Sequence, residues 1–395
     1  MDPLISRRAL NRATLERQFL LRRTDRPVVE VVEHLGGLQA QTPHTWYTGL
    51  WNRIDGFRAD YASARLESRE LVRIALQRST IHLVSARDCL AMRPLVQVVT
   101  ERMTRTTFGR RLAGVDLDEL AAVGRALLEE RPMTFAELGR ALAGRWPDHD
   151  PHALGQGVRW LVPLAQVPPR GLWGRSGPIA HAPADTWLAG TETDTEAGTE
   201  AGTRAKAHAR AQAGGQAGTG VAPMTPAELV VRYLAAFGPA TVKDVQTWSG
   251  LTRLAEVVEG LDLVRFRDED GRTYHDLPDA PRPGDDVPAP VRLMYDFDNL
   301  FLSHADRSRV ITEAGFAAMR GFMGTNVMPR LILVDGFTAG DWTLTRARGT
   351  STLGLHLWEP IADLRAVERE GRRLLEFLAP GDRHETSVFD RPSKT

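Results

Sequence analysis

Two glutamines separated by one residue, Gln39 and Gln41, are the side chains that could together carry out a hydrolysis. Each amide offers a carbonyl acceptor and two N–H donors without a charge, so a pair can hold one water molecule in a fixed orientation. Such a water suits a reaction whose leaving group departs readily, because a positioned nucleophile then matters more than a strong base. Loss of a cationic N7-alkylated purine from its sugar is a reaction of this kind. The alternative interpretation is that both amides bond only to nearby backbone.

The residues around the pair predict an extended segment with both amides on the same side. Side-chain direction in an extended chain repeats every two residues, whereas on a helix Gln39 and Gln41 would diverge. Gly36 and Gly37 precede the pair, and Pro43 follows it and disfavours helical geometry in the residue before it. The paired-amide geometry is therefore consistent with the local sequence.

Residues 1–115 predict a winged helix that carries the glutamines. Apolar spacing indicates helices over residues 5–22, 28–35 and 61–70, followed by a strand pair within 71–84. Residues 1–111 contain 19 Arg, no Lys and 11 Asp or Glu, a net charge of +8 that the rest of the chain balances with −8. This basic half could steer a polyanion to one face, although Arg-rich helices are also common as solvated faces.

Two further units repeat this order of elements. Residues 116–189 predict helices over 116–131 and 152–164, with the capping-box pair Thr134 and Glu137 opening a helix between them, and then a strand, turn and strand over 165–183. Residues 223–285 predict three helices and a hairpin, and residues 286–379 predict short antiparallel strands and a last helix over 361–378. We therefore predict an α+β fold with three tandem winged-helix motifs and a C-terminal antiparallel β region.

Two segments are predicted to lack a fixed structure. Residues 190–222 lack the apolar side chains needed to offset their ordering entropy, which predicts a disordered linker or insertion, and residues 380–395 are predicted to be a flexible tail.

Composition also excludes several classes of protein. The single cysteine, Cys89, excludes an intramolecular disulfide, a thiolate zinc cage and an iron–sulfur cluster ligated by this chain. No apolar run is long enough to cross a bilayer, so we expect a cytoplasmic protein with no membrane partner.

Several runs of sequence resemble the winged-helix AlkZ-like DNA glycosylase family. They are G-L-Q-A-Q-T-P around the glutamines, G-L-W-N-R at 49–53, L-Q-R-S-T-I-H-L-V at 76–84, Y-D-F-D-N-L-F-L-S-H-A-D-R-S at 295–308 and L-I-L-V-D-G at 331–336. The resemblance implies tandem winged-helix motifs and the excision of alkylated bases, some of them bulky adducts of DNA-reactive natural products. The catalytic motif of that family is glutamine, an apolar residue, then glutamine or aspartate, which Gln39, Ala40 and Gln41 fit.

On this resemblance we expect a monofunctional DNA glycosylase that acts as a monomer in base excision repair. Its expected partner is double-stranded DNA carrying N7-alkylated purines, with bulky adducts or crosslinks among the candidate lesions. Gln39 and Gln41 would position the water, with no cofactor and no metal. The sequence leaves open whether the protein provides self-resistance to a toxin producer. The arginines predicted to contact DNA are Arg53, Arg78, Arg170, Arg175, Arg307 and Arg309. The last two could equally pair with Asp296, Asp298 or Asp306.

Two other functions are compatible with the sequence. Asp296, Asp298, His304 and Asp306 have the residue types of a two-metal phosphoryl-transfer site, although they could equally form a turn and an ion-pair network. Winged helices also serve more often in binding than in catalysis, so a non-catalytic DNA-binding regulator or damage sensor is the main alternative.

Overall fold

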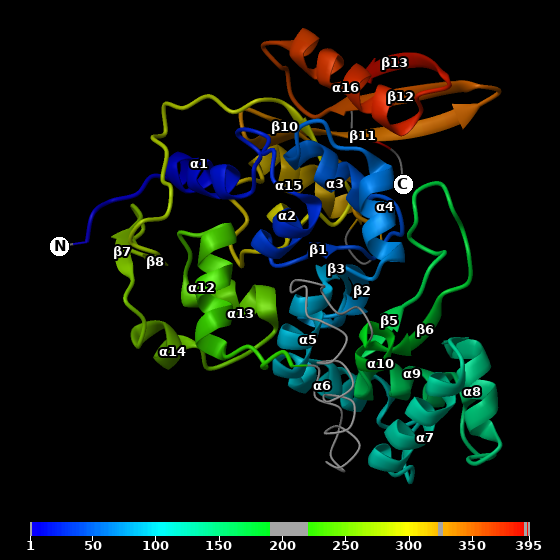
Figure 1. The fold of residues 1–395 in the computed structure, drawn as a ribbon. Helices are drawn as coiled ribbons and strands as arrows, with labels where there is room; N and C mark the ends of the chain where they lie inside the picture. Colours follow the sequence, from blue (N-terminus) through cyan, green and yellow to red (C-terminus); the bar gives the residue numbers. More distant parts are fainter. Residues whose placement is uncertain (1, 190–219, 323–326, 391–392, 394–395) are drawn as a thin grey trace, which may run out of the picture.

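The computed structural model describes residues 2–189, 220–322, 327–390 and 393. Among these residues, the glutamine pair lies at one edge of a six-stranded antiparallel sheet of order β1-β3-β2-β5-β6-β4 (Figure 1). Its strands are β1 (Leu38–Gln39), β2 (Leu71–Ala75), β3 (Ile81–Ser85), β4 (Met133–Thr134), β5 (Leu164–Gln166) and β6 (Ala180–Pro183). Because β2 pairs with β5, the predicted units 1–115 and 116–189 share one continuous sheet. Their division into separate winged helices stays a prediction.

Helices cover both faces of β2 and β3, because successive side chains of a strand point to opposite sides. Leu71 and Leu83 face one cluster of buried apolar residues, and Val72 and Val84 face another. The helices of this half are α1 (Arg7–Arg17), α2 (Val28–His34), α3 (Trp46–Arg53), α4 (Ala59–Glu67), α5 (Ala86–Leu95), α6 (Gln97–Phe108), α7 (Leu117–Glu130), α8 (Phe135–Ala143), α9 (Pro151–Leu161) and α10 (Ala184–Leu188), with a 3-10 turn, η1 (Gln77–Ser79).

These helices follow the local sequence signals closely. Thr134 and Glu137 form the predicted capping box at the start of α8. Helix α1 ends before its predicted boundary at residue 22, because Phe19 adopts a left-handed backbone conformation with a φ of 54°. Cys89 is a buried thiol on α5, as predicted, and burial raises its pKa to about 12.

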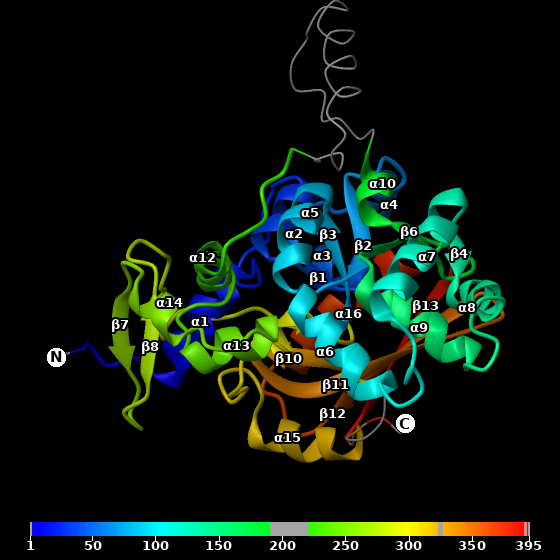
Figure 2. The same ribbon diagram turned by 90° about the horizontal axis from the view of Figure 1, so that it is seen from below.

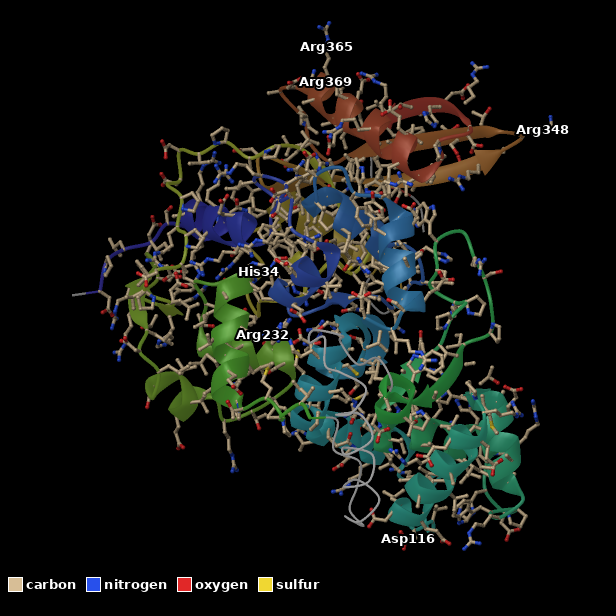
Figure 3. All side chains as sticks on the ribbon, in the orientation of Figure 1. His34, Asp116, Arg232, Arg348, Arg365 and Arg369 are labelled. Carbon is tan, nitrogen blue, oxygen red and sulfur yellow. The ribbon has the colours of Figure 1, made fainter. Side chains whose placement is uncertain are left out.

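The C-terminal region forms a second sheet of order β13-β12-β11-β10-β9. The strands are β9 (Arg292–Leu293), β10 (Arg330–Val334), β11 (Phe337–Ala347), β12 (Thr350–Leu357) and β13 (Arg383–Phe389). The helical segments are η2 (Asn299–Phe301), α15 (Glu313–Met319), η3 (Arg320–Phe322) and α16 (Leu364–Leu378). Strands β11 and β12 form a long hairpin with Arg348 at its tip (Figure 3). This sheet lies above α3 and α4 in Figure 1 and therefore behind the first half of the chain in Figure 2, which is seen from below.

Strand β13 contradicts the prediction of a flexible tail over residues 380–395. Residues 383–389 belong to the segment predicted as a flexible tail, yet they pair with β12 over seven positions. The pairing is parallel, whereas the described strand pairs within residues 286–379 are antiparallel, as predicted for that region. The physical reason is the helix α16, which carries the chain back so that β13 starts at the same end as β12, as a parallel crossover requires.

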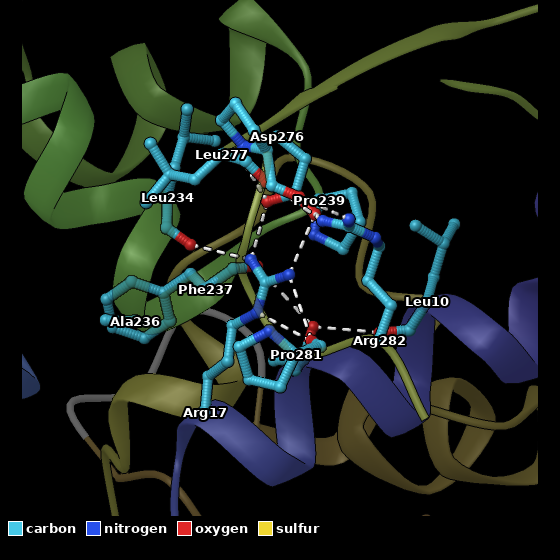
Figure 4. A network of polar contacts seen from close by, with 12 residues as sticks. Leu10, Arg17, Leu234, Ala236, Phe237, Pro239, Asp276, Leu277, Pro281 and Arg282 are labelled. Atoms are coloured by element: carbon cyan, nitrogen blue, oxygen red, sulfur yellow. Dashed lines mark hydrogen bonds and ion pairs between the residues drawn. The ribbon is translucent and has the colours of Figure 1, made fainter. Parts of the chain in front are cut away.

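Residues 223–285 contain the predicted three helices and hairpin, which are α12 (Pro226–Phe237), α13 (Val242–Ser249), α14 (Ala255–Glu259), β7 (Val264–Arg267) and β8 (Thr273–Asp276). A buried ion pair fastens this unit to α1. Arg17 donates through both terminal nitrogens to Asp276 at 2.7 and 2.8 Å, and Arg282 donates to the same carboxylate at 2.7 Å (Figure 4). Arg17 also donates to Leu234 O, so α1 contacts both α12 and the hairpin of the third unit.

Two other expectations concern segments outside these elements. The predicted linker at 190–222 lies outside the described residues except for its last three. No helix among the described residues is long and apolar enough to cross a membrane.

Candidate active site

Gln39 ends strand β1 at the point where the chain leaves the sheet. It lies opposite His82 of β3, and the next residue, Ala40, donates its backbone N–H to Ile81 O at 2.7 Å. An antiparallel pair would normally return a bond from Ile81 N to Ala40 O. Here Ile81 N donates to the side-chain oxygen of Gln41 at 3.2 Å. The Gln41 amide therefore takes the place of a backbone carbonyl at the end of the strand.

Both amide groups are oriented by partners that can only donate a hydrogen bond. Gln39 Oε1 accepts from Arg78 Nη2 at 3.0 Å, and Gln41 Oε1 accepts from Ile81 N. A guanidinium and a backbone N–H have no acceptor atom, so each amide must turn its oxygen toward them and its NH2 group away. Each oxygen keeps a second lone pair. Gln39 is 4% exposed and Gln41 is exposed, so the pair reaches from the interior to the surface.

Arg78 is held in a strained conformation in the turn between β2 and β3. Its φ is 54° and that of Ser79 is 60°, a left-handed geometry that non-glycine residues adopt at a cost in free energy. Arg78 Nη1 donates to Trp248 O at 2.7 Å while Nη2 donates to Gln39. Burial, followed by repulsion from Arg307, lowers the pKa of Arg78 to about 10, so the guanidinium is charged at neutral pH.

Residues 295–299 fix the backbone of Gln39 from the open side of β1. Asn299 Oδ1 accepts from Gln39 N at 3.1 Å, and Asn299 Nδ2 donates to Gly37 O. Tyr295 OH donates to Gln39 O at 3.1 Å. Asn299 thus pairs with the edge of β1 as a neighbouring strand would. The sequence run at 295–308 carried the family resemblance, but the role of Asn299 and Tyr295 was missed because nothing local links them to residue 39.

Gly36 and Gly37 allow the chain to pass closely between β3 and α13. Gly37 has a φ of 90°, and a Cβ atom there would lie 2.7 Å from Val84 Cγ1 and 3.0 Å from Leu83 O. Gly36 has a φ of 65°, and its Cβ would lie 3.1 Å from the Trp248 ring. Both the backbone conformation and the space therefore require glycine, which explains the G-G that precedes the pair.

Two buried polar side chains lie next to the glutamine strand. His82 Nδ1 bonds to Thr80 O at 2.9 Å, and burial together with the charge of Arg78 lowers the His82 pKa to about 3. His82 is therefore neutral and is no general acid at neutral pH. Arg73 Nη2 donates to Ala40 O at 2.8 Å, which holds the residue between the two glutamines. Burial, followed by repulsion from Arg170, lowers the Arg73 pKa to about 10.

A sequence profile of the DNA glycosylase AlkZ-like family matches residues 32–377. The matched range includes the glutamine pair, Arg78 and Asn299. The chain belongs to the AlkZ-like DNA glycosylase family. Its fold is similar to the solved structure of Streptomyces sahachiroi DNA glycosylase AlkZ, with a TM-score of 0.72 and 17% sequence identity over 98% of this chain and 100% of that one. No curated protein sequence matches the chain.

Membership of the AlkZ-like family confirms the resemblance seen in the sequence and identifies an enzyme, a DNA glycosylase. It decides against the alternative of a regulator or sensor that only binds DNA. The similarity to the Streptomyces structure supports the mixed α and β architecture.

The structure contradicts two of the phosphate contacts predicted for this glycosylase. Arg53 is 1% exposed, and both of its terminal nitrogens donate to the carboxylate of Asp298 at 2.8 Å. Arg309 is 4% exposed and donates to Pro239 O at 2.9 Å. Neither guanidinium can contact a DNA phosphate, because each is buried and its N–H groups already donate to another segment of the protein.

The other four arginines have different environments. Arg78 holds Gln39, which is a positioning contact. Arg307 is half-buried close to Arg78, and burial lowers its pKa. Arg170 and Arg175 lie in the loop between β5 and β6, where Arg170 donates to Gly177 O at 3.3 Å and the Arg175 side chain is 65% exposed. Arg170, Arg175 and Arg307 stay predicted phosphate contacts.

The residues of the alternative two-metal site have separate partners. Asp298 binds Arg53, His304 Nε2 bonds to Phe237 O at 3.0 Å, and Asp306 binds Arg272 at 2.6 Å. Asp296 Oδ2 accepts from the Thr42 hydroxyl at 2.6 Å. No group of three or more His, Cys, Asp or Glu side chains in the described part of the chain is arranged to hold a metal ion. The ion-pair interpretation of these residues therefore fits the structure better.

Proposed function

We propose that this AlkZ-like glycosylase hydrolyses the N-glycosidic bond of N7-alkylated purines in duplex DNA, with bulky adducts and crosslinks among its substrates. The observation that carries the proposal is the orientation of the two amides, whose oxygens accept from Arg78 and from Ile81 N and each keep a second lone pair for a water. An amide that cannot rotate can hold a water at one angle to C1′ without any reorganisation during the reaction.

The proposed reaction needs no general acid. The C1′–N9 bond breaks and its electrons neutralise the positive charge of the N7-alkylated purine, which leaves as a neutral base. The sugar develops oxocarbenium character at C1′, and the oxygen of the bound water forms the new C1′–O bond. The unused lone pairs of Gln39 Oε1 and Gln41 Oε1 accept hydrogen bonds from that water. Its proton passes to solvent beside the exposed Gln41, because an amide oxygen is too weak a base to keep it.

The enzyme is expected to leave the DNA strand intact. Strand cleavage by a glycosylase needs an amine that forms a Schiff base with the sugar. The described residues contain one lysine, Lys243, which lines a cavity of about 1020 Å³ together with Asp270 and Arg309 and without either glutamine. The product should therefore be an abasic site that breaks only when alkali is added.

The exposure of Gln41 supports attack on a base that is not fully extruded from the helix. Neither of two cavities in the structure, of about 1020 and 670 Å³, is lined by Gln39 or Gln41. A charged N7-alkylpurine is already activated, so the enzyme needs less help from a closed pocket. A structure with lesion DNA that shows the base enclosed in a protein pocket would contradict this part of the proposal.

The direct test is release of base in EDTA from duplex DNA that carries N7-methylguanine or a bulky N7-guanine adduct. We expect the native protein to release base, and Gln39→Ala and Gln41→Ala each to lower the single-turnover rate about 10- to 100-fold while DNA affinity is kept. Gln156→Ala on α9, which changes an amide away from the site, is the matched control. Native rates in both glutamine variants would overturn the mechanism, and the comparison of the two lesions reports the size of adduct accepted.

A further inference from the structure

Helix α16 presents a row of arginines on the face that it turns away from the protein. Val367, Leu374 and Leu375 pack into the core on its inner side. The exposed side carries Arg365, Arg369, Arg372 and Arg373. Arg365, Arg369 and Arg372 are spaced by four and three positions, and Arg373 follows Arg369 by four, so the four residues lie on one side of the helix, which also carries the exposed Glu376. Figure 3 shows Arg365 and Arg369 projecting from α16 at the top of the molecule.

A pocket of about 670 Å³ adjoins this face, between α16, the chain that follows α1 and the start of β9. Its charged lining consists of Arg22, Arg23, Arg292, Arg369 and Arg373, with Asp55 and Glu370 as the carboxylates. The lining is therefore basic, although the chain as a whole has no net charge.

The buried part of the pocket has more positive than negative charge. Glu370 is 7% exposed and accepts from Arg23 at 2.7 Å and from Arg373 at 3.0 Å, while Arg292 Nη1 lies 3.5 Å from it. The single negative charge of Glu370 thus lies within 3.5 Å of three positively charged guanidinium groups. Burial, followed by repulsion from Arg23, lowers the pKa of Arg292 to about 10. An added anion would relieve this repulsion.

We propose that the arginine face of α16 and the adjoining pocket bind the phosphate groups of a DNA segment outside the glutamine site. Arg365 and Arg373 are eight residues apart, so the row spans about 12 Å of helix and can follow several phosphates of one strand. The pocket shares no residue with the glutamine site, and Figure 1 shows α3 between α16 and β1. Four exposed arginines against one exposed glutamate, Glu376, give this side of α16 a net positive charge, which suits a nucleic-acid backbone.

This second site would hold the enzyme on DNA while the glutamine site samples bases. Contacts to phosphates carry no sequence information and release counterions, so they add affinity for undamaged DNA. The inference does not depend on the glutamine mechanism, because it concerns DNA that contains no lesion. Its test can therefore fail or succeed independently of base release.

The experiment compares native protein with Arg365→Glu/Arg369→Glu in binding a long undamaged duplex over a range of salt concentrations. Both side chains are exposed and Arg369 has only a 3.6 Å pair with Asp363, so the fold should be kept, as a thermal melt would check. We expect at least about a tenfold loss of affinity at ~0.1 M salt and a salt slope shallower by about two. Arg131→Glu/Arg140→Glu, a pair of exposed arginines near α8, makes the same change of net charge and is the control.

Equal affinity of the α16 variant and the control would overturn the proposal. A second arm uses inorganic tripolyphosphate, which we expect to raise the melting temperature of the native protein and to do so less for Arg373→Gln. If tripolyphosphate stabilises the protein while the α16 variant binds DNA like the control, the pocket takes a free phosphate ligand and the assignment to DNA is wrong.

Discussion

Replacing Arg78 with leucine removes the donor that orients Gln39 and leaves the glutamine itself in place. The guanidinium makes two short hydrogen bonds, to Gln39 Oε1 at 3.0 Å and to Trp248 O at 2.7 Å. Hydrogen bonds to a charged group contribute about 1.5–3 kcal/mol. If the bond to Gln39 acts fully in the transition state, its loss lowers the single-turnover rate about 10- to 100-fold.

The assay must separate the rate of base release from the affinity for DNA. Arg78 would otherwise be a phosphate contact, as the sequence predicted, and its replacement would then weaken DNA binding without changing the rate at saturating enzyme. Single-turnover release of N7-methylguanine over a range of enzyme concentrations gives both quantities. Arg78→Lys is the conservative variant. Its single ammonium can reach Gln39 or Trp248 O but cannot span both, so we expect an intermediate rate.

The two outcomes are distinct. A reduced rate at saturation with little change in affinity supports positioning of the Gln39 amide. If Arg78→Leu keeps the native rate at saturating enzyme but binds DNA more weakly, and Arg78→Lys regains the native DNA affinity, the positioning role is refuted. Arg78 would then be a phosphate contact, as the sequence predicted. Arg307→Leu is a useful companion, because that residue is half-buried near Arg78 and makes no hydrogen bond to either glutamine within the described residues.

Three further predictions concern stability. Burial lowers the pKa to about 3 in three histidines, which are His82, His181 and His304. The unfolded chain therefore binds more protons between pH 6.5 and 3, and the free energy of unfolding should fall as pH falls through this window, by about 1.4 kcal/mol per pH unit for each histidine; an equally steep dependence in His181→Gln would contradict this. Asp276→Asn leaves Arg17 buried without its counter-charge and should cost about 3–5 kcal/mol in urea unfolding, whereas an unchanged midpoint would show that the pair contributes nothing. Gly37→Ala should lower the melting temperature more than Gly114→Ala, whose φ is 86° but whose Cβ would meet no atom within 4 Å; equal losses would leave backbone conformation as the whole effect.

Local patterns predicted the helices and the extended conformation at Gln39 because both depend on neighbouring residues, whereas Gln41 lies in a bend beyond β1. The capping box at Thr134 and the glycines before the pair act within a few positions of themselves, so their signals are visible in the sequence. The pairing of β2 with β5 and the parallel β13 depend on which distant strands meet, and strands as short as these carry little pattern that selects a partner.

The arginines show that the sequence alone does not predict which charged side chains are exposed. Residues 1–111 carry a formal charge of +8, but five of their arginines are buried, namely Arg12, Arg17, Arg53, Arg73 and Arg93. Counting charged residues treats every guanidinium as available to DNA. Arg53, in this basic half, was assigned to a phosphate although it joins two segments of the protein through Asp298. Composition gives the type of a charge, and only packing decides whether it faces the solvent.

The chemistry proposed for the glutamine pair also depends on residues that are distant from it in the sequence. A glutamine amide with no fixed partner can exchange its oxygen and NH2 group by rotation, and two such amides would present any of four arrangements to a water. Arg78 and Ile81 N select one of them, because both can only donate. Asn299, 260 positions along the chain from Gln39, holds the backbone of the same residue. On the proposed mechanism the two amides can hold one water only after the C-terminal region has packed against β1, and a glutamine pair without donor-only neighbours should not perform the proposed reaction.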